Sequence, residues 1–284
     1  MQATRRIFLS ALLLGASLLV LVSGCTPRKA FRPGMDTPPS AWSVFRESYC
    51  APLPAQSVSV TASLFYTRVL DTGIKRSNRT TLNLWGDFAR PLRLDVAAGI
   101  GHALAHIRED SGGLTAFYPD QKAAYTHVNP VLGATRMGMP FPFSLQDLAR
   151  VLAGSFSSLV PERYDSGERT AQGYEFRFDR GPVSLLVLDG WARPVRLEGA
   201  TRIYNGDMRG WSIEFDRYPD EAKGVPQPGV LNLSIDNGET GVLRVKSRSF
   251  RNGDWPGQAL DLSLPEGTDL FRLDTNVRSH EEES

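Results

Sequence analysis

Apolar and polar side chains alternate with a period of two along most of the chain after residue 56. This pattern restricts the fold more than any other feature of the sequence. Val58, Val60, Ala62 and Leu64, for example, alternate with serine and threonine. Successive side chains of a β-strand point to opposite faces, so the alternation predicts strands with one buried and one solvated face. The same pattern recurs over residues 92–96, 174–178, 211–215 and 231–235, and further strand candidates cover residues 80–85, 103–109, 114–118, 123–128, 183–188, 195–203 and 242–250.

Short turn sequences separate these strand candidates. They are Ser111-Gly112-Gly113, Pro119-Asp120, Asp189-Gly190, Asn205-Gly206 and Asn237-Gly238. Parallel neighbours would need crossovers of about a dozen residues or more, so connections this short favour antiparallel pairing. We therefore predict a mostly β fold over residues 57–275, an open half-barrel of about eleven to twelve antiparallel strands.

One segment in the middle of the chain has helical spacing instead. Ser144 and Asp147 form a variant of the capping box at its start, and Gly154 is a stop signal. The apolar residues between them fall on one helical face: Leu145, Leu148, Val151 and Leu152. We expect one or more helices, this one among them, to cap the concave hydrophobic face of the sheet.

The first 25 residues have the organisation of an export signal. Arg5 and Arg6 precede an almost wholly apolar stretch over residues 7–22, and small residues then lead to Cys25. The apolar stretch is shorter than the roughly twenty residues that a spanning helix needs. The Ser-Gly-Cys sequence resembles the lipobox of bacterial lipoproteins, which implies cleavage before Cys25 and acylation of its side chain. The alternative is a plain cleaved signal followed by an incidental cysteine.

These features divide the chain into four expected regions. Residues 1–24 form the signal peptide, and residues 25–56 form a lipidated, proline-rich tether of partly extended character. Trp42 and nearby aromatic residues interrupt the tether, which makes a short helix or docked segment there reasonable. Residues 57–275 form the sheet domain, and the polar, acidic tail 276–284 is expected to be disordered.

Charge and cysteine content restrict the partners. Without Arg5 and Arg6, 30 basic side chains face 31 acidic ones, which gives no electrostatic reason to expect nucleic acid as a partner. Only two cysteines are present. With Cys25 acylated, Cys50 has no partner within the chain, so we expect a partly packed thiol, with an intermolecular disulfide as the alternative.

The common catalytic signatures are missing, so we expect a protein that is not an enzyme and has no cofactor. The sequence has no nucleophile elbow and no phosphate-cradling glycine loop. His102 and His106 are four residues apart, which would suit a metal ion on a helix. Their surroundings predict a strand, where they would lie about 13 Å apart at roughly 3.3 Å per residue. We therefore expect no metal site.

An apolar stretch over residues 137–143 leads directly into the predicted helix. It contains two methionines and two phenylalanines among prolines and glycine, which together form an adaptable apolar surface. These side chains could fill one end of the sheet as core, or could line a pocket for an acyl chain. The candidate pocket residues are Met139, Phe141, Phe143, Leu145, Leu148 and Leu152.

This segment resembles the one that enters the lid helix of the LolB outer-membrane lipoprotein receptors. The resemblance rests on Met139-Pro140-Phe141-Pro142 with the leucines that follow, and on Arg93-Leu94-Asp95 followed by Gly99-Ile100-Gly101. It extends over about residues 57–178. It implies an open, half-closed barrel whose helices cap a hydrophobic cavity.

The resemblance also implies a function in lipoprotein localisation. Such a receptor accepts acylated lipoproteins from a periplasmic LolA-like carrier and places them in the outer membrane. Ile100 would be the membrane-contacting residue at a loop tip. Thr26 stands where the aspartate linked to inner-membrane retention would be, so outer-membrane anchoring of a monomer is expected. The extended tether and the strands after residue 204 depart from the family pattern. A structural, interaction or lipid-sensing lipoprotein of the cell envelope with a filled core is the alternative.

Overall fold

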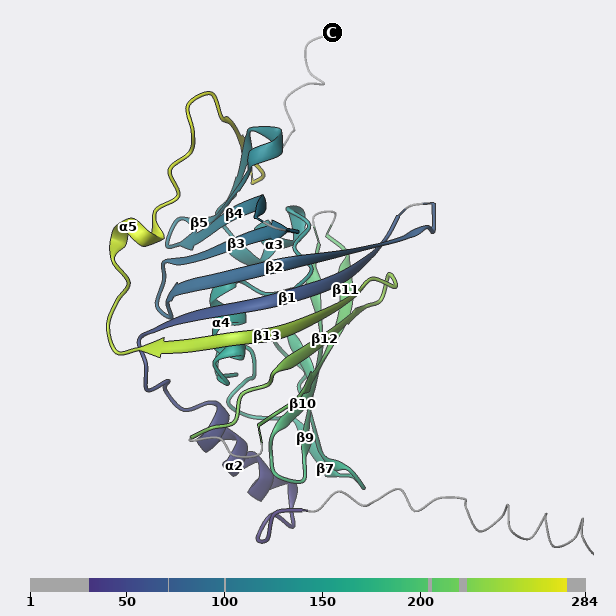
Figure 1. Cartoon of the computed structure of the whole chain (residues 1–284). Coiled ribbons are helices and arrows are strands. Elements are labelled where there is room, and N and C mark those ends of the chain that lie inside the picture. Colours follow the sequence, from purple (N-terminus) through teal and green to yellow (C-terminus); the bar gives the residue numbers. More distant parts are fainter. Residues whose placement is uncertain (1–30, 71, 100, 204–205, 220–223, 275–284) are drawn as a thin grey trace, which may run out of the picture.

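The computed structural model describes residues 31–70, 72–99, 101–203, 206–219 and 224–274. Within these residues the chain forms one sheet of fourteen strands (Figure 1). The strands are β1 (Ser57–Val69), β2 (Lys75–Asp87), β3 (Leu92–Ala98), β4 (His102–Asp110), β5 (Gly113–Tyr118), β6 (Ala123–His127), β7 (Ser166–Arg169), β8 (Gly173–Arg177), β9 (Val183–Asp189), β10 (Pro194–Arg202), β11 (Met208–Asp216), β12 (Val230–Ile235), β13 (Thr240–Arg251) and β14 (Asp269–Arg272).

The sheet consists of two meanders that meet at β1 and β13. The strand order is β14-β6-β5-β4-β3-β2-β1-β13-β12-β11-β10-β9-β8-β7, so β14 and β7 are separate edges and the sheet is open. The expected open, mostly β fold is confirmed. The expected strand number is too low, because the two four-residue edge strands carry no clear apolar alternation. One pairing also departs from the expected antiparallel arrangement: β14 follows a long connection from β13 and pairs parallel to β6.

The period-two pattern sets the two faces of the sheet. Along β1, the inward residues Val58, Val60, Ala62 and Leu64 are 0%, 2%, 2% and 6% exposed, whereas the serine and threonine side chains that alternate with them over residues 59–63 are less buried. Most strands other than the edge strands β7 and β14 contribute such a row, and these rows together form the apolar concave face. Burial of these rows is the main driving force for folding, at about 25 cal/mol per Å² of apolar surface.

Along the chain, one helix precedes β1, two lie between the two meanders and a short one follows β13. They are α2 (Pro38–Tyr49), α3 (Pro130–Arg136), α4 (Leu145–Leu152) and α5 (Gly257–Leu260), with a 3₁₀ turn η1 (Pro119–Gln121). Helix α4 lies behind β1 and β13 in Figure 1, so the viewer faces the convex side of the sheet. None of the described helices is long and apolar enough to cross a bilayer.

Helix α4 begins and ends where the sequence predicts. The Ser144 side chain accepts a hydrogen bond from the Asp147 backbone N–H at 3.0 Å, and Gly154 has a φ of 81°, which favours glycine. Its buried residues are Leu145, Leu148, Ala149, Val151 and Leu152. The expected amphipathic helix over the concave face is therefore confirmed.

Helix α2 occupies part of the segment that we expected to be a tether. Thr37 caps its N-terminus, and Ala41 and Phe45 are fully buried against the sheet domain. Trp42 contacts Phe176 of β8, with ring centroids 5.0 Å apart. The packed structure thus includes a docked helix within residues 25–56, because this helix carries enough apolar surface to join the core.

Candidate functional site

One end of the concave face is filled by the protein's own aromatic side chains. Phe156, which follows α4, packs against Phe45 and Tyr49 of α2 and Phe215 of β11, with ring centroids 5.2–6.3 Å apart. The Phe156 backbone N–H donates to the Tyr49 carbonyl at 2.7 Å. Such aromatic pairs add to the stabilisation from area burial alone. We call this region the filled end, because aromatic side chains of the chain itself pack against one another there.

The apolar segment that precedes α4 crosses the concave face. Tyr118 donates a hydrogen bond to the Met137 carbonyl at 3.0 Å, and the Met139 backbone N–H donates to Ala134 at 2.9 Å. Farther along, Phe143 packs edge-on against Trp211 at 5.3 Å. The segment is thereby held at both of its ends, and its middle borders the space described next.

Beside this segment lies an apolar cleft of about 400 Å³. Its walls come from the inward rows of β1–β4 and from the segment entering α4. They include Leu64, Leu82, Leu94, Val96, Ala98, Leu104, Ile107, Met139, Pro140, Phe141 and Leu148. Among the described residues that line this apolar cleft, none is acidic and Arg79 is the only charged one.

The apolar cleft exists because helix α4 is much shorter than the strands that it covers. Helix α4 has eight residues and is therefore about 12 Å long. Strands β1 and β2 have thirteen residues each and extend about 43 Å at roughly 3.3 Å per residue. The helix covers the inward rows near one end of these strands and leaves apolar side chains uncovered toward the β1–β2 hairpin.

A second, polar pocket of about 350 Å³ adjoins the apolar cleft. The two share Tyr66, Met139, Pro140 and Phe141 in their walls. We call this pocket the polar mouth. Its charged residues are Arg68, Arg136, Arg209 and Glu239.

Tyr66 stands at the boundary between the apolar cleft and the polar mouth. Its hydroxyl donates to a Glu239 carboxylate oxygen at 2.7 Å. Burial and this hydrogen bond both raise the pKa of Tyr66, so the phenol stays protonated as a donor. Glu239 is itself buried and lies 3.7 Å from Arg68.

A buried ion pair fixes the start of the lid helix. The Glu109 side chain is fully buried and accepts a hydrogen bond from Arg90 Nε at 2.8 Å. Its other carboxylate oxygen accepts from the Leu145 backbone N–H at 2.6 Å, at the N-terminus of α4. Burial is the main reason that the pKa of Glu109 is raised. Sequence reasoning missed this residue, although an acidic side chain at an inward strand position was a usable signal.

The structure divides the candidate pocket residues between two environments. Met139, Phe141 and Leu148 line the apolar cleft. Phe143, Leu145 and Leu152 are buried in the core and do not line it. The two alternatives for this segment, core and pocket wall, therefore hold for different residues. Cys25 and Ile100 lie outside the described residues.

The two histidines considered for metal binding lie on strand β4, as expected. His102 pairs with Asp120 at 3.2 Å, and His106 pairs with Asp95 at 2.9 Å. In the described part of the chain, no group of three or more potential ligands is placed to hold a metal ion. Cys50 is half-buried and unpaired there.

No protein-family model matches the sequence, and no curated protein matches it. Solved structures resemble the open curved sheet with its covering helices. A LolA-superfamily protein from Nitrosomonas europaea matches with a TM-score of 0.54 and 15% identity, over 80% of this chain and 98% of that chain. A putative outer membrane lipoprotein-sorting protein domain from Vibrio parahaemolyticus gives a TM-score of 0.45 and 13% identity, over 72% and 88%. A DUF1329 family protein from Desulfovibrio piger gives 0.49 and 9%, over 79% and 99%.

The fold therefore belongs to the class of open, curved antiparallel sheets with helices over the concave face. More particularly, it is similar to the LolA-superfamily fold, as the sequence resemblance predicts. The likeness at 15% identity concerns the fold, and a fold can carry different functions on different sites. A proposal for the function therefore has to rest on the residues and the geometry of the site.

Proposed function

We propose that the protein is a non-catalytic, lipid-anchored lipoprotein that binds the acyl chains of lipoproteins or lipids in the apolar cleft. It would thereby help to place these acylated molecules in the outer membrane. The observation that supports this most strongly is the cleft itself, about 400 Å³ of space bordered almost wholly by apolar side chains. Ligand pockets are usually concave, mostly apolar and largely preformed. A LolA-like fold around the cleft agrees with this role.

An acyl chain suits the cleft because its walls offer mainly hydrophobic contact. Each methylene group moved from water into such a site contributes about 0.8 kcal/mol. Met139 has an unbranched, flexible side chain that can adapt to acyl chains of different shape. Most of the polar groups among the cleft residues, such as Asn78 and Thr80, come from one end of β2, and Tyr66 contributes a hydroxyl from β1.

The direct test is to fill the cleft from the end of β3. Ala98 lines the cleft, whereas Ala97 is its neighbour on the opposite face of the same strand, where it pairs with Thr81. We expect Ala98→Trp to abolish binding of a fluorescent fatty-acid analogue, and Ala97→Trp to leave binding unchanged. Equal binding by both variants and the unchanged protein would refute the cleft as the acyl site.

Anchoring is a separate part of the proposal. Acylation of Cys25 would attach the protein to the outer membrane facing the periplasm, with acylated lipoproteins and a periplasmic LolA-like carrier as partners of a monomer. Cys25→Ala should release the protein from the membrane fraction and remove labelling by a fatty-acid analogue. Full labelling of that variant would contradict the lipoprotein assignment. Ile100 is proposed as the membrane-contacting residue; its neighbours Gly99 and Gly101 both have positive φ values, as in a tight turn.

The filled end supports a second candidate function. A structural, interaction or lipid-sensing lipoprotein would need the stable scaffold that the aromatic cluster around Phe156 provides. It would not need the apolar cleft. If neither fatty-acid analogues nor co-purified lipids bind to the unchanged protein, this second function is the better one.

A further inference from the structure

The inward rows of two strands change from apolar to basic at the edge of the apolar cleft. On β1, the inward positions run Leu64, Tyr66, Arg68. On β11, they run from Ile213 through Trp211 to Arg209. The period of two therefore places both guanidinium groups on the concave side, in the polar mouth. Arginines on the convex face are ordinary surface residues. Arginines on the concave face at the rim of a cavity do not add to the burial of the apolar core, so another role has to account for them.

Charge within the polar mouth is unbalanced. Among its described lining residues, three are arginines, with Arg136 contributed by α3, and Glu239 is the only acidic one. The Glu239 carboxylate already accepts a hydrogen bond from Tyr66 and lies beside Arg68. Arg68 is nevertheless 68% exposed, and no salt bridge joins Arg209 to an acidic side chain within the described residues. The mouth therefore has a surplus of donors for an anion.

We propose that the polar mouth binds the anionic headgroup of the amphiphile whose acyl chain occupies the apolar cleft. This inference rests on the proposed function and narrows its ligand to lipids that carry a phosphate or carboxylate. Guanidinium groups match both anions with paired, charge-assisted hydrogen bonds. The shared walls at Tyr66 and Met139 allow one molecule to occupy both spaces.

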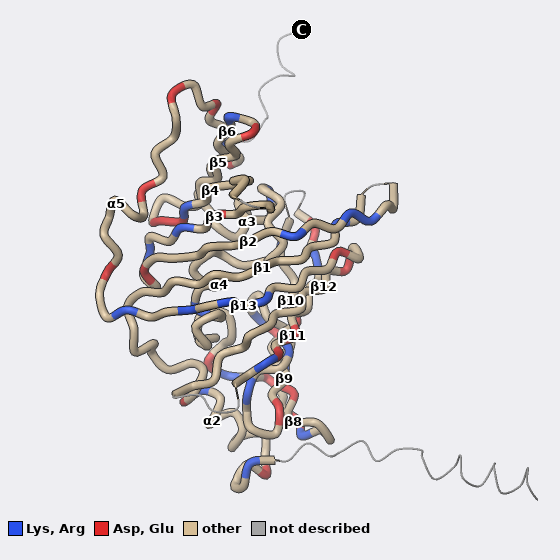
Figure 2. The backbone as a smooth tube through the Cα atoms, viewed as in Figure 1, with Lys and Arg blue, Asp and Glu red and all other residues tan. Residues whose placement is uncertain are grey.

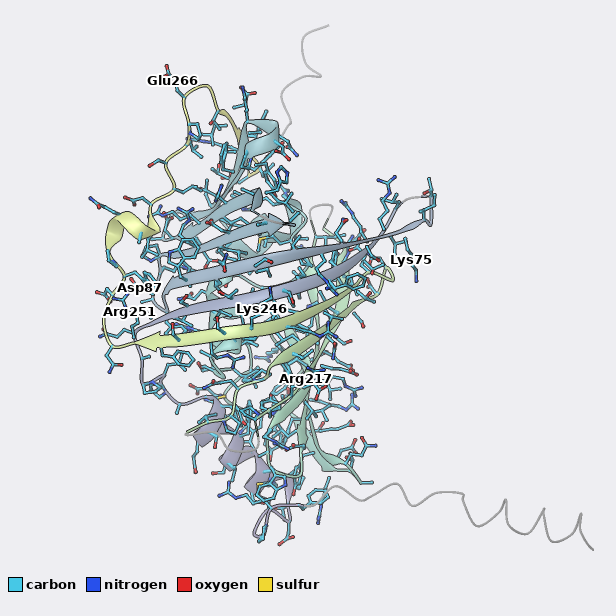
Figure 3. All side chains as sticks on the ribbon, in the orientation of Figure 1. Lys75, Asp87, Arg217, Lys246, Arg251 and Glu266 are labelled. Atoms are coloured by element: carbon cyan, nitrogen blue, oxygen red, sulfur yellow. The ribbon has the colours of Figure 1, made fainter. Side chains whose placement is uncertain are left out.

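Position in the molecule agrees with this assignment. The polar mouth lies toward the β1–β2 hairpin, where Lys and Arg also gather on the backbone trace (Figure 2). Lys75, the first residue of β2, is labelled near this hairpin in Figure 3. Basic side chains around an entrance attract anionic ligands over several ångströms, an effect that salt screens. A headgroup held at the mouth stays in contact with water, so its charge need not be fully desolvated.

The test compares two ligands of equal chain length, dodecyl phosphate and dodecanol, below the micelle concentration. We expect the phosphate to bind about tenfold more tightly, equal to about 1.4 kcal/mol. The double variant Arg68→Gln with Arg209→Gln should bind both ligands with equal affinity. The matched control is Arg244→Gln with Lys246→Gln, which removes the same charge from the convex face of β13, where Lys246 is labelled in Figure 3. This control should keep the tenfold difference.

The outcomes separate this inference from the proposed function. If neither ligand binds, the proposed function fails. If both bind with the same affinity to the unchanged protein, the cleft binds chains and the headgroup inference alone is overturned. The last measurement is competition with inorganic phosphate. If inorganic phosphate displaces dodecyl phosphate at similar concentrations, the polar mouth is a site for free phosphate and the headgroup assignment is wrong. Loss of the difference at high salt supports it.

Discussion

The filled end and the open end of the concave face are built from the same kind of strand but differ in what covers them. At the filled end, α2 and the residues after α4 place Phe45, Tyr49 and Phe156 on the sheet. At the open end, the apolar rows of β1–β4 border a cleft of about 400 Å³. Alternation in a strand therefore shows that one face avoids water, and it leaves open whether the chain or a ligand covers that face.

Helix α4 connects the two ends, and its residues sharpen the contrast. Leu148 is 3% exposed and lines the apolar cleft, whereas Leu152, one turn later, is 2% exposed and does not line it. Residues four apart lie on the same helical face. Two neighbouring leucines of one helix thus belong to different environments, which makes them a matched pair for experiment.

The largest expected effect is that of Leu152→Glu. A carboxylate at this position would be buried without a partner, and we expect the variant to be unfolded or to melt far below the unchanged protein. Leu148→Glu places the new carboxylate at the wall of the apolar cleft, so we expect it to destabilise the fold less than Leu152→Glu and to abolish binding of fatty-acid analogues. Circular dichroism melts and binding titrations on both variants provide the comparison. Equal destabilisation by the two substitutions would show that Leu148 is packed in the core in the same way as Leu152, and that no cleft borders it.

A smaller effect is expected at the ion pair that holds the start of α4. Glu109→Ala leaves the Leu145 backbone N–H and Arg90 without their acceptor, which should lower the free energy of unfolding by about 2 kcal/mol. Glu109→Gln keeps an acceptor oxygen and should cost less. Urea denaturation measures both changes. A loss below 0.5 kcal/mol for Glu109→Ala, on the order of ordinary surface substitutions, would show that the lid does not depend on this contact.

The smallest effect is chemical and concerns Cys50 at the end of α2. Burial raises the pKa of the Cys50 thiol from its ordinary 9.0 to about 11. The thiolate is the reactive form, so at pH 8 Cys50 should react with iodoacetamide roughly a hundredfold more slowly than a free thiol. The rate should rise tenfold per pH unit up to about pH 11. A cysteine placed in the open end by Thr80→Cys should react much faster. Fast labelling of Cys50 would mean that the filled end opens.

Much of the sheet could be predicted from sequence because most strands carry their own periodicity. The row from Val58 to Leu64 and the capped helix after Ser144 depend on neighbours a few residues away. Edge strands β7 and β14 have no such row, so their existence depends on the partner strand that each one meets. Helix α3 was missed, although Asn129 and Pro130 are a recognisable cap and first turn.

The candidate site was predicted in part for a different physical reason. The sequence identified the apolar segment near Met139 and Phe141, but it could not separate core from cleft. That separation depends on the relative lengths of α4 and the strands, and on the docking of α2. Arg68 and Arg209 lie far apart in sequence and meet only through the pairing of β1, β13, β12 and β11. A local sequence pattern cannot predict that these two arginines line the same pocket.

The pairing of β1 with β13 has a consequence for how the chain folds. Ser57 pairs with Arg251, about 190 residues later, whereas almost every other pairing joins consecutive strands. Hairpins of consecutive strands form quickly, and contacts between distant segments form slowly because a long loop has to close first. A chain that has completed only β1–β6 would present the thirteen-residue β1 as a bare edge, ready to pair with another molecule. Pairing of β13 with β1 covers this edge. Aggregation during refolding should therefore depend on how quickly β13 pairs with β1.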